Sequence, residues 1–149
     1  MWNRLIRTTP DPALTVVRLA LGAVFFAHGA TKVLGWWGGY GFSATMSGFE
    51  RTGIPAVFAF LAIAAEFCGG IGLIIGLLGR VAAFGIACNM IVAIVKVHAP
   101  NGFFMNWAGT KKGEGFEYHV LVLAMTVVIM IAGSGAWSAD RALSSKPMP

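Results

Sequence analysis

Several ionisable side chains interrupt the otherwise apolar segments of this chain. His28 and Lys32 lie four residues apart in FFAHGATKVLGWW, and Glu66 lies within FLAIAAEFCGG. An ionisable group inside a membrane-like segment must be paired, neutralised or hydrated, because exposing it to lipid is costly. A carboxylate and an imidazole at such a depth can exchange protons with a bound molecule. We therefore predict that Glu66 and His28 are catalytic residues.

The first apolar segment carries a helical stripe that we expect to face the protein interior. Its members follow one another at intervals of three or four residues: Arg18, Gly22, Phe25, Gly29 and Lys32, with His28 on the flank. Charged and small side chains share this face, and in membranes both favour contact with other helices over contact with lipid. We expect Glu66 to pair with His28, Lys32 or Arg18.

Further polar side chains gather toward the same end of the later apolar segments. Asn89 and Lys96 are seven residues apart and are expected to share a helix face, while His98 and Glu117 lie at the outer ends of their segments. Aromatic residues follow the first segment directly. The predicted substrate-binding residues are Lys32, Arg18, Asn89, Lys96, Trp36 and Trp37, and the predicted cofactor-binding residues are His98 and His119.

This convergence predicts an outward-facing pocket with a polar base and an aromatic mouth, which suits a quinone headgroup or a small anion. The three histidines also raise haem or metal ligation, but no His-x-x-His or HExxH spacing supports either, and we predict no metal site. A structural alternative is that Glu66 pairs with a basic residue to hold the helices in register. A permeation path is a third alternative, for which Arg18 is the evident polar group toward the inside.

Four apolar stretches must position these residues, at about 14–35, 54–79, 80–98 and 118–136. Each is close to the ~20 residues that a helix needs to cross a bilayer. The chain is 57% hydrophobic and only 11% charged, and its 20 glycines are typical of closely packed membrane helices. We predict an all-α integral membrane protein, a single domain over residues 1–149 built as a four-transmembrane-helix bundle. The net charge of +5 is dispersed, which gives nucleic-acid binding little support.

Loop lengths and charges predict the topology. The second and third spans meet at Gly79-Arg80 in a tight hairpin, so the long aromatic and Gly-rich connections 36–53 and 99–117 share the opposite side, where they are expected to fold over the bundle as a lid. Basic residues slightly favour the hairpin side, with Arg4, Arg7, Arg18, Arg80, Arg141 and Lys146 against Lys32, Arg51, Lys96, Lys111 and Lys112. This bias predicts cytoplasmic N and C termini and extracytoplasmic loops.

The order and spacing of several short motifs resemble the DoxX family of small four-helix membrane proteins. These motifs are Arg18 with Gly29 and Lys32, Glu66 before a Gly-rich helix ending GLLGR, a loop with FF, and the closing GSGAWSADR. The resemblance covers about residues 14–142. The arginine, lysine and membrane glutamate of the family fall on Arg18, Lys32 and Glu66, and its ending falls on Trp137, Ser138 and Asp140.

The resemblance implies a multi-pass protein of the bacterial cytoplasmic (inner) membrane that is linked to redox metabolism. Family members resemble subunits of a thiosulfate:quinone oxidoreductase or partners in complexes that manage oxidative and thiol stress. This chain has no cysteine motif or cofactor fingerprint of its own. A subunit role, with other membrane or redox subunits or further copies of the chain as partners, is therefore favoured over independent catalysis.

Our leading hypothesis is a membrane subunit of a quinone-linked or stress-related redox system. In it, Glu66 and His28 exchange protons near a quinone headgroup, while Lys32 and Lys96 attract an anionic substrate. The alternative is a non-catalytic assembly or scaffold subunit of a larger complex, in which the buried charges hold helices in register.

Overall fold

The computed structural model describes residues 2–144, and every regular element in that part of the chain is helical. Lys146, one of the basic residues from which the orientation in the membrane was predicted, lies outside the described residues. The α-helices are α1 (Trp2–Ile6), α2 (Pro12–Val33), α3 (Gly41–Arg51), α4 (Ala56–Ile75), α5 (Gly79–Ala93), α6 (Glu117–Ala132) and α7 (Ala139–Ser144). Short 3₁₀ turns occur at Trp36–Gly38 and Ala99–Asn101, and a π-helical segment occurs at Ile94–His98.

Three helical stretches are long and apolar enough to cross a membrane. They are α2, α4, and the continuous stretch from α5 through residue 101. The fourth predicted span corresponds to α6, which is a shorter apolar helix of 16 residues. It ends before Gly133, whose φ of 90° favours glycine and turns the chain out of the helix.

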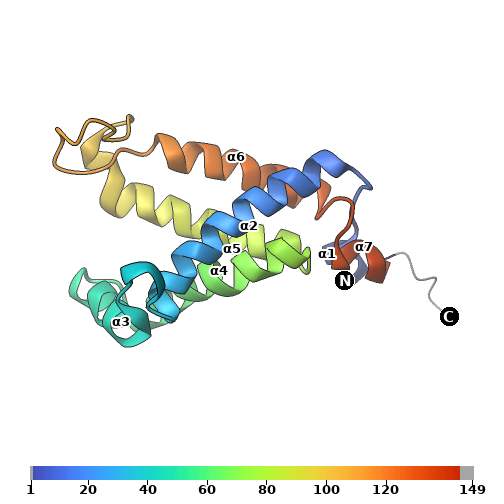
Figure 1. Ribbon diagram of the computed structural model, residues 1–149, viewed down its shortest axis with the longest axis horizontal. Coiled ribbons are helices and arrows are strands. Elements are labelled where there is room, and N and C mark those ends of the chain that lie inside the picture. The colour runs from blue at the N-terminus through green and yellow to red at the C-terminus, as the bar shows by residue number, and fades with distance from the viewer. Residues whose placement is uncertain (1, 145–149) are drawn as a thin grey trace.

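The four long helices form a bundle with its connections sorted to two ends. Figure 1 shows α3 and the chain between α5 and α6 at one end, and α1 with α7 at the other. Helix α2 packs along α4, α4 pairs with α5, and α5 pairs with α6. The turn between α4 and α5 is only three residues long, because Gly76 and Leu78 both take left-handed conformations. The core side chains are Leu21, Phe25, Leu73, Ala83, Ile86, Met90, Val122 and Ile129.

Glycines bring α2 and α4 into backbone contact. A Cβ added at Gly29 would lie 2.4 Å from the Cα of Phe67, and one added at Gly70 would lie 2.4 Å from the backbone nitrogen of Phe26. Neither position has room for a methyl group. The small residues of the predicted α2 stripe therefore do mark the face that meets another helix.

The Gly-rich connection 36–53 contains a helix that the sequence analysis did not predict. Helix α3 places Phe42, Met46 and Phe49 at helical spacing, and the Phe42 ring meets Phe60 of α4 edge-on at a centroid distance of 6.4 Å. An apolar stripe on an otherwise polar helix at the end of a membrane bundle is typical of a segment that lies along the membrane surface.

At the end where α1 and α7 meet, the buried side chain of Arg18 joins α2 to two other parts of the chain. Its guanidinium donates to the carbonyls of Leu73 and Ile74 at the end of α4, and to those of Ser134 and Trp137 in the C-terminal segment. Arg18 therefore has a structural role in closing this end of the bundle. It makes no contact with Glu66, the partner that the sequence analysis considered for it.

Asp140 completes the same closure. Its carboxylate accepts hydrogen bonds from the backbone N–H groups of Leu78 (2.7 Å) and Gly79 (3.0 Å) and from the hydroxyl of Ser134 (2.6 Å). The two N–H groups lie at the start of α5, where helical donors have no partner inside the helix. The closing motif GSGAWSADR thus caps the hairpin between α4 and α5.

Candidate functional site

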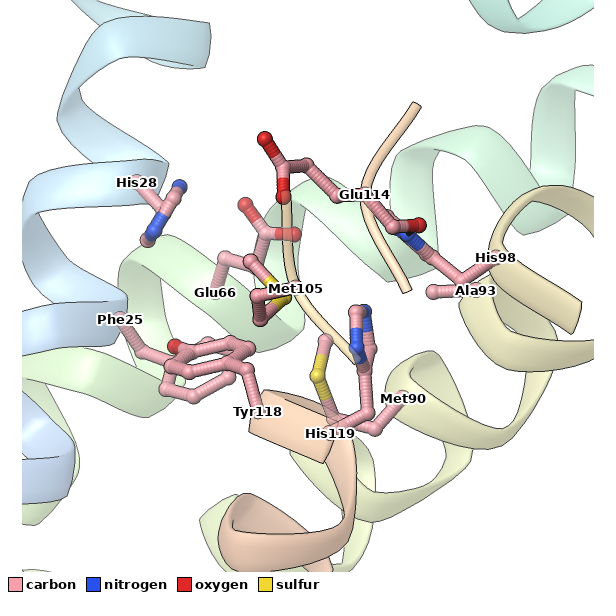
Figure 2. A pocket seen from close by; sticks show the side chains of 10 residues that line it. All are labelled: Phe25, His28, Glu66, Met90, Ala93, His98, Met105, Glu114, Tyr118 and His119. Atoms are coloured by element: carbon pink, nitrogen blue, oxygen red, sulfur yellow. Dashed lines mark hydrogen bonds between the residues drawn. The ribbon is translucent and has the colours of Figure 1, made fainter. Parts of the chain in front are cut away.

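A cavity of about 370 Å³ opens between the helices near the end that carries the long connections. Its walls come from five parts of the chain: Phe25 and His28 of α2, Glu66 of α4, Met90, Ala93 and His98 of α5 and its extension, Met105 and Glu114 of the following loop, and Tyr118 and His119 of α6. Figure 2 shows these side chains arranged around a common space. The volume lies in the range of small-molecule sites, and the surface of the cavity is mostly apolar although six of its ten lining residues carry polar groups.

Glu66 is one of the two carboxylates in the wall, with Glu114, and is itself held on two sides. One carboxylate oxygen pairs with the ammonium group of Lys32, and the other accepts a hydrogen bond of 2.9 Å from the side-chain amide of Asn89. Glu66 is only 7% exposed. This is the one ion pair within residues 2–144, and it joins α2 to α4, while the hydrogen bond from Asn89 ties the same carboxylate to α5. Of the three expected partners, Glu66 therefore takes Lys32.

Two polar atoms at the start of α6 are buried without a hydrogen-bond partner in the described structure. They are the hydroxyl of Tyr118 and Nδ1 of His119, a residue that is only 5% exposed. Both side chains line the cavity: in Figure 2, His119 rises from α6 into it, and the Tyr118 ring extends from α6 toward Phe25. Buried polar groups are nearly always satisfied, because an unpaired donor or acceptor costs about 1–3 kcal/mol. An orphaned pair that borders a cavity is typical of a site that receives a polar ligand.

His98 packs against His119 on the same wall. Their ring centroids are 4.1 Å apart, and the rings are inclined at 45°. Nδ1 of His98 lies 2.9 Å from the carbonyl oxygen of Glu114, so this nitrogen must donate, which leaves Nε2 as the acceptor of the neutral ring. Within residues 2–144, no group of three or more His, Cys, Asp or Glu side chains is arranged to hold a metal ion.

The loop between α5 and α6 is held in place over the cavity. Glu117 accepts hydrogen bonds from the backbone N–H of Met105 (3.1 Å) and from the indole N–H of Trp107 (3.0 Å). Its own N–H donates to the carbonyl of Phe103 (2.8 Å). Met105 and Glu114 line the cavity, whereas Trp107 is exposed. The loop thus contributes a thioether and a carboxylate to the site, and its aromatic rings lie outside.

The predicted site residues divide into three groups by their positions. Four of them line the cavity: Glu66, His28, His98 and His119. Lys32 and Asn89 do not line it, but both bind the carboxylate of Glu66. Arg18, Lys96, Trp36 and Trp37 lie elsewhere: Arg18 at the opposite end, Lys96 exposed, and the two tryptophans exposed beyond the end of α2. Trp36 meets Phe26 and Trp37 edge-on.

The π-helical segment Ile94–His98 explains why Lys96 does not line the cavity as predicted. A π turn contains more residues than an α turn, so side chains after residue 93 are rotated relative to an uninterrupted α-helix. The seven-residue spacing that would align Lys96 with Asn89 is therefore broken. The same rotation brings His98 to the cavity wall, and π segments of this kind are frequent at functional sites.

Tyr118 and Met105 are the main site residues that the sequence analysis missed. Tyr118 lies between Glu117 and His119 in the run EYH, where three polar side chains open an apolar helix, and that pattern was the available signal. Met105 carries no such signal, because only the fold of the loop brings it to the cavity.

Comparison with known protein families identifies the family of this chain. The model of the DoxX family matches residues 13–99, more than half of the chain. The chain belongs to the DoxX family. The match covers α2 to α5 with the π segment, and the α6 residues Tyr118 and His119 lie beyond it. No solved structure matches this DoxX protein.

Three relatives cover most of this DoxX protein. An uncharacterised membrane protein of Mycobacterium tuberculosis is 32% identical, with 97% of this chain and 90% of the relative aligned. The inner membrane protein YqjF of Escherichia coli is 27% identical, with 91% and 95% aligned. A Bacillus subtilis protein that carries the name "Putative oxidoreductase CatD" is 28% identical, with 80% and 78% aligned. With three helices long and apolar enough to cross a bilayer, this member of the DoxX family is a multi-pass membrane protein.

Proposed function

We propose that this DoxX protein is a four-span subunit of a quinone-linked redox system in the cytoplasmic membrane, and that its cavity binds the quinone headgroup. One observation carries the proposal: Tyr118 and His119 present buried, unpartnered polar atoms beside a cavity that also contains the carboxylate of Glu66. A quinone headgroup is a flat ring with oxygens at both ends, so it can use such hydrogen-bonding groups while its ring contacts Phe25 and Met90. Helix α6 is proposed as the fourth span, and the cavity end as extracytoplasmic.

The residues of the chain would bind the headgroup and handle protons. Tyr118 would donate to a headgroup oxygen, and the packing of His98 against His119 would keep the second imidazole oriented. Glu66 and His28 lie on neighbouring walls, where they can exchange a proton with a bound molecule. Lys32 balances the charge of Glu66, which is a different role from attracting an anionic substrate. A bound quinone would supply the redox chemistry, as a carrier of two electrons and two protons.

The surroundings of the cavity support a subunit role. Electrons must enter or leave through another protein or group, because the cavity lining contains no cysteine and the chain has no cofactor fingerprint. We therefore propose membrane or redox proteins, or further copies of this chain, as partners. The name of the B. subtilis relative CatD is consistent with a redox setting.

The chain offers a matched pair of substitutions for the test. Tyr118→Phe removes only the orphaned hydroxyl, whereas Tyr40→Phe removes the hydroxyl of the other tyrosine, which is 87% exposed and outside the cavity. Losing one hydrogen bond to a ligand should weaken binding of a soluble quinone analogue about 5- to 10-fold in Tyr118→Phe. Tyr40→Phe should bind as the parent protein does.

Unfolding measurements on the same variants separate binding from folding. Tyr118→Phe should be at least as stable as the parent protein without ligand, because its hydroxyl has no partner to lose. Equal analogue affinity in both tyrosine variants would overturn the quinone site.

The ion pair between Lys32 and Glu66 supports a second candidate, an assembly or scaffold subunit. The pair joins α2 to α4 and the Asn89 amide ties Glu66 to α5, as expected of polar groups that set helix register. Under this alternative, Glu66→Gln and Lys32→Met lower thermal stability or co-purification with partners but leave turnover of the assembled complex unchanged. Under the quinone proposal, Glu66→Gln also lowers turnover at a quinone concentration that saturates the site.

A further inference from the structure

A second hollow lies at the opposite end of the bundle, where α1 and α7 meet. It has a volume of about 340 Å³ and is lined by Arg4 and Arg7 at α1, Arg80 of α5 and Ile131 of α6. Three of its four lining residues are arginines, and no carboxylate within residues 2–144 pairs with any of them. Such a concentration of uncompensated positive charge is electrostatically unfavourable unless an anion offsets it.

Arg80 forms the fixed part of this hollow. Its Nη1 donates to the carbonyls of Met130 and Ile131 at the end of α6, and its Nη2 donates to the carbonyl of Arg7 at 2.9 Å. Its Nε is buried and has no hydrogen-bond partner in the described structure. The guanidinium is thus held in one orientation by the backbone with a donor still unused, and planar guanidinium groups match the geometry of phosphate oxygens.

The surroundings of the hollow are those of a lipid headgroup region. The spanning helices begin or end here, at Pro12, Gly79 and Ala132. Ile131 is 74% exposed at the edge of the hollow, and Trp2 and Leu5 on α1 are also exposed. Tryptophan and arginine near helix ends are typical of the membrane interface, where a charged pocket meets the start of the acyl chains.

We propose that the hollow formed by Arg4, Arg7 and Arg80 binds the phosphate of an anionic phospholipid, with the acyl chains running along the exposed side of α6. The three guanidinium groups neutralise the headgroup, and Ile131 provides the adjoining apolar surface. Headgroup phosphates occur in both leaflets, so the assignment does not depend on which side the termini face. It is also independent of the quinone cavity, which lies at the other end of the bundle.

The test uses the full-length protein in a neutral detergent and counts bound lipid by native mass spectrometry. Phosphatidylglycerol is the probe, phosphatidylcholine with the same acyl chains lacks the net charge, and inorganic phosphate lacks the chains. Arg4→Gln/Arg7→Gln removes two positive charges without removing any side-chain hydrogen bond that the structure describes. The double variant Arg51→Gln/Arg141→Gln removes the same charge from exposed positions outside the hollow.

We expect phosphatidylglycerol to bind about 30-fold more weakly to Arg4→Gln/Arg7→Gln and with parental affinity to Arg51→Gln/Arg141→Gln. Unchanged thermal unfolding of both variants would show that the fold is intact. Equal weakening in the two variants would overturn the proposal, because it would indicate general charge attraction. Equally tight binding of phosphatidylcholine would overturn it too. Displacement of the lipid by inorganic phosphate at equal concentration would assign the hollow to free phosphate instead.

Discussion

Replacing Arg18 by methionine should be among the most destabilising single changes in this protein. The side chain is 1% exposed and donates to four backbone carbonyls that belong to α4 and to the C-terminal segment. Methionine has a similar length and can occupy the apolar part of the space, but it cannot donate. The change therefore removes the hydrogen bonds while it limits the cavity left behind.

The size of the effect follows from the carbonyls that lose the guanidinium as a donor. The bonds to Leu73 and Ser134 are buried, so water cannot replace the guanidinium at either carbonyl. The carbonyl of Ser134 is left unpaired, at about 1–3 kcal/mol, whereas the carbonyl of Leu73 keeps the N–H of Gly76 as a donor and loses one hydrogen bond, at about 0.5–1.5 kcal/mol. The free energy of unfolding should therefore fall by about 2–4 kcal/mol. The carbonyls of Ile74 and Trp137 lie nearer the surface and should add little, because water or lipid headgroups can replace the guanidinium there.

Equilibrium unfolding in mixed detergent micelles, followed by circular dichroism, measures this change. Arg51→Met is the matched control, since Arg51 is exposed and its Nε makes a single bond of 3.2 Å to the carbonyl of Ser47 within its own helix. The control should change stability by no more than about 0.5 kcal/mol. If Arg18→Met proved as mild as Arg51→Met, the closure attributed to Arg18 would be wrong.

Two further predictions concern the same packing. Gly29→Ala should destabilise the protein by about 1–3 kcal/mol, because its Cβ would collide with the backbone of Phe67. Gly48→Ala in α3, which has open space around it, should be neutral or slightly stabilising, and thermal unfolding of the two variants tests the difference. Asp140→Ala should lower stability by about 1–2 kcal/mol because the start of α5 loses its cap, and faster hydrogen exchange at the amides of Leu78 and Gly79 would localise the effect.

The sequence predicted which face of a helix turns toward its neighbours better than it predicted where along the bundle each residue lies. The spacing of Gly22, Gly29 and Lys32 correctly indicated the side of α2 that meets α4, and the pairing of Lys32 with Glu66 was among the expected contacts. Arg18 shares that stripe but lies fourteen residues from Lys32, or about 21 Å along the helix axis. Helical periodicity indicates on which side of a helix a residue lies. It does not indicate that residues at the two ends of one span have different roles.

Other features depend on local changes in backbone conformation that the spacing of polar and apolar residues does not indicate. The π segment rotates Lys96 away from Asn89, and an apolar run such as IVKVH gives no sign of a change from α to π winding. Tyr118 at a helix start is expected to be an interfacial aromatic residue, and only the packed structure reveals that its hydroxyl is buried and unpaired. Helix α3 was detectable from Phe42, Met46 and Phe49, but the surrounding glycines favoured a loop.

The proposed binding of a quinone headgroup in the cavity between α2, α4, α5 and α6 can be tested by photo-crosslinking. The purified protein is irradiated with a photoreactive quinone analogue and analysed by peptide mass spectrometry. We expect labels on Met105, Tyr118 or His119, and their loss when excess unlabelled quinone is present. Labels found only on lipid-facing side chains such as Val16 or Phe58, undiminished by competitor, would contradict it.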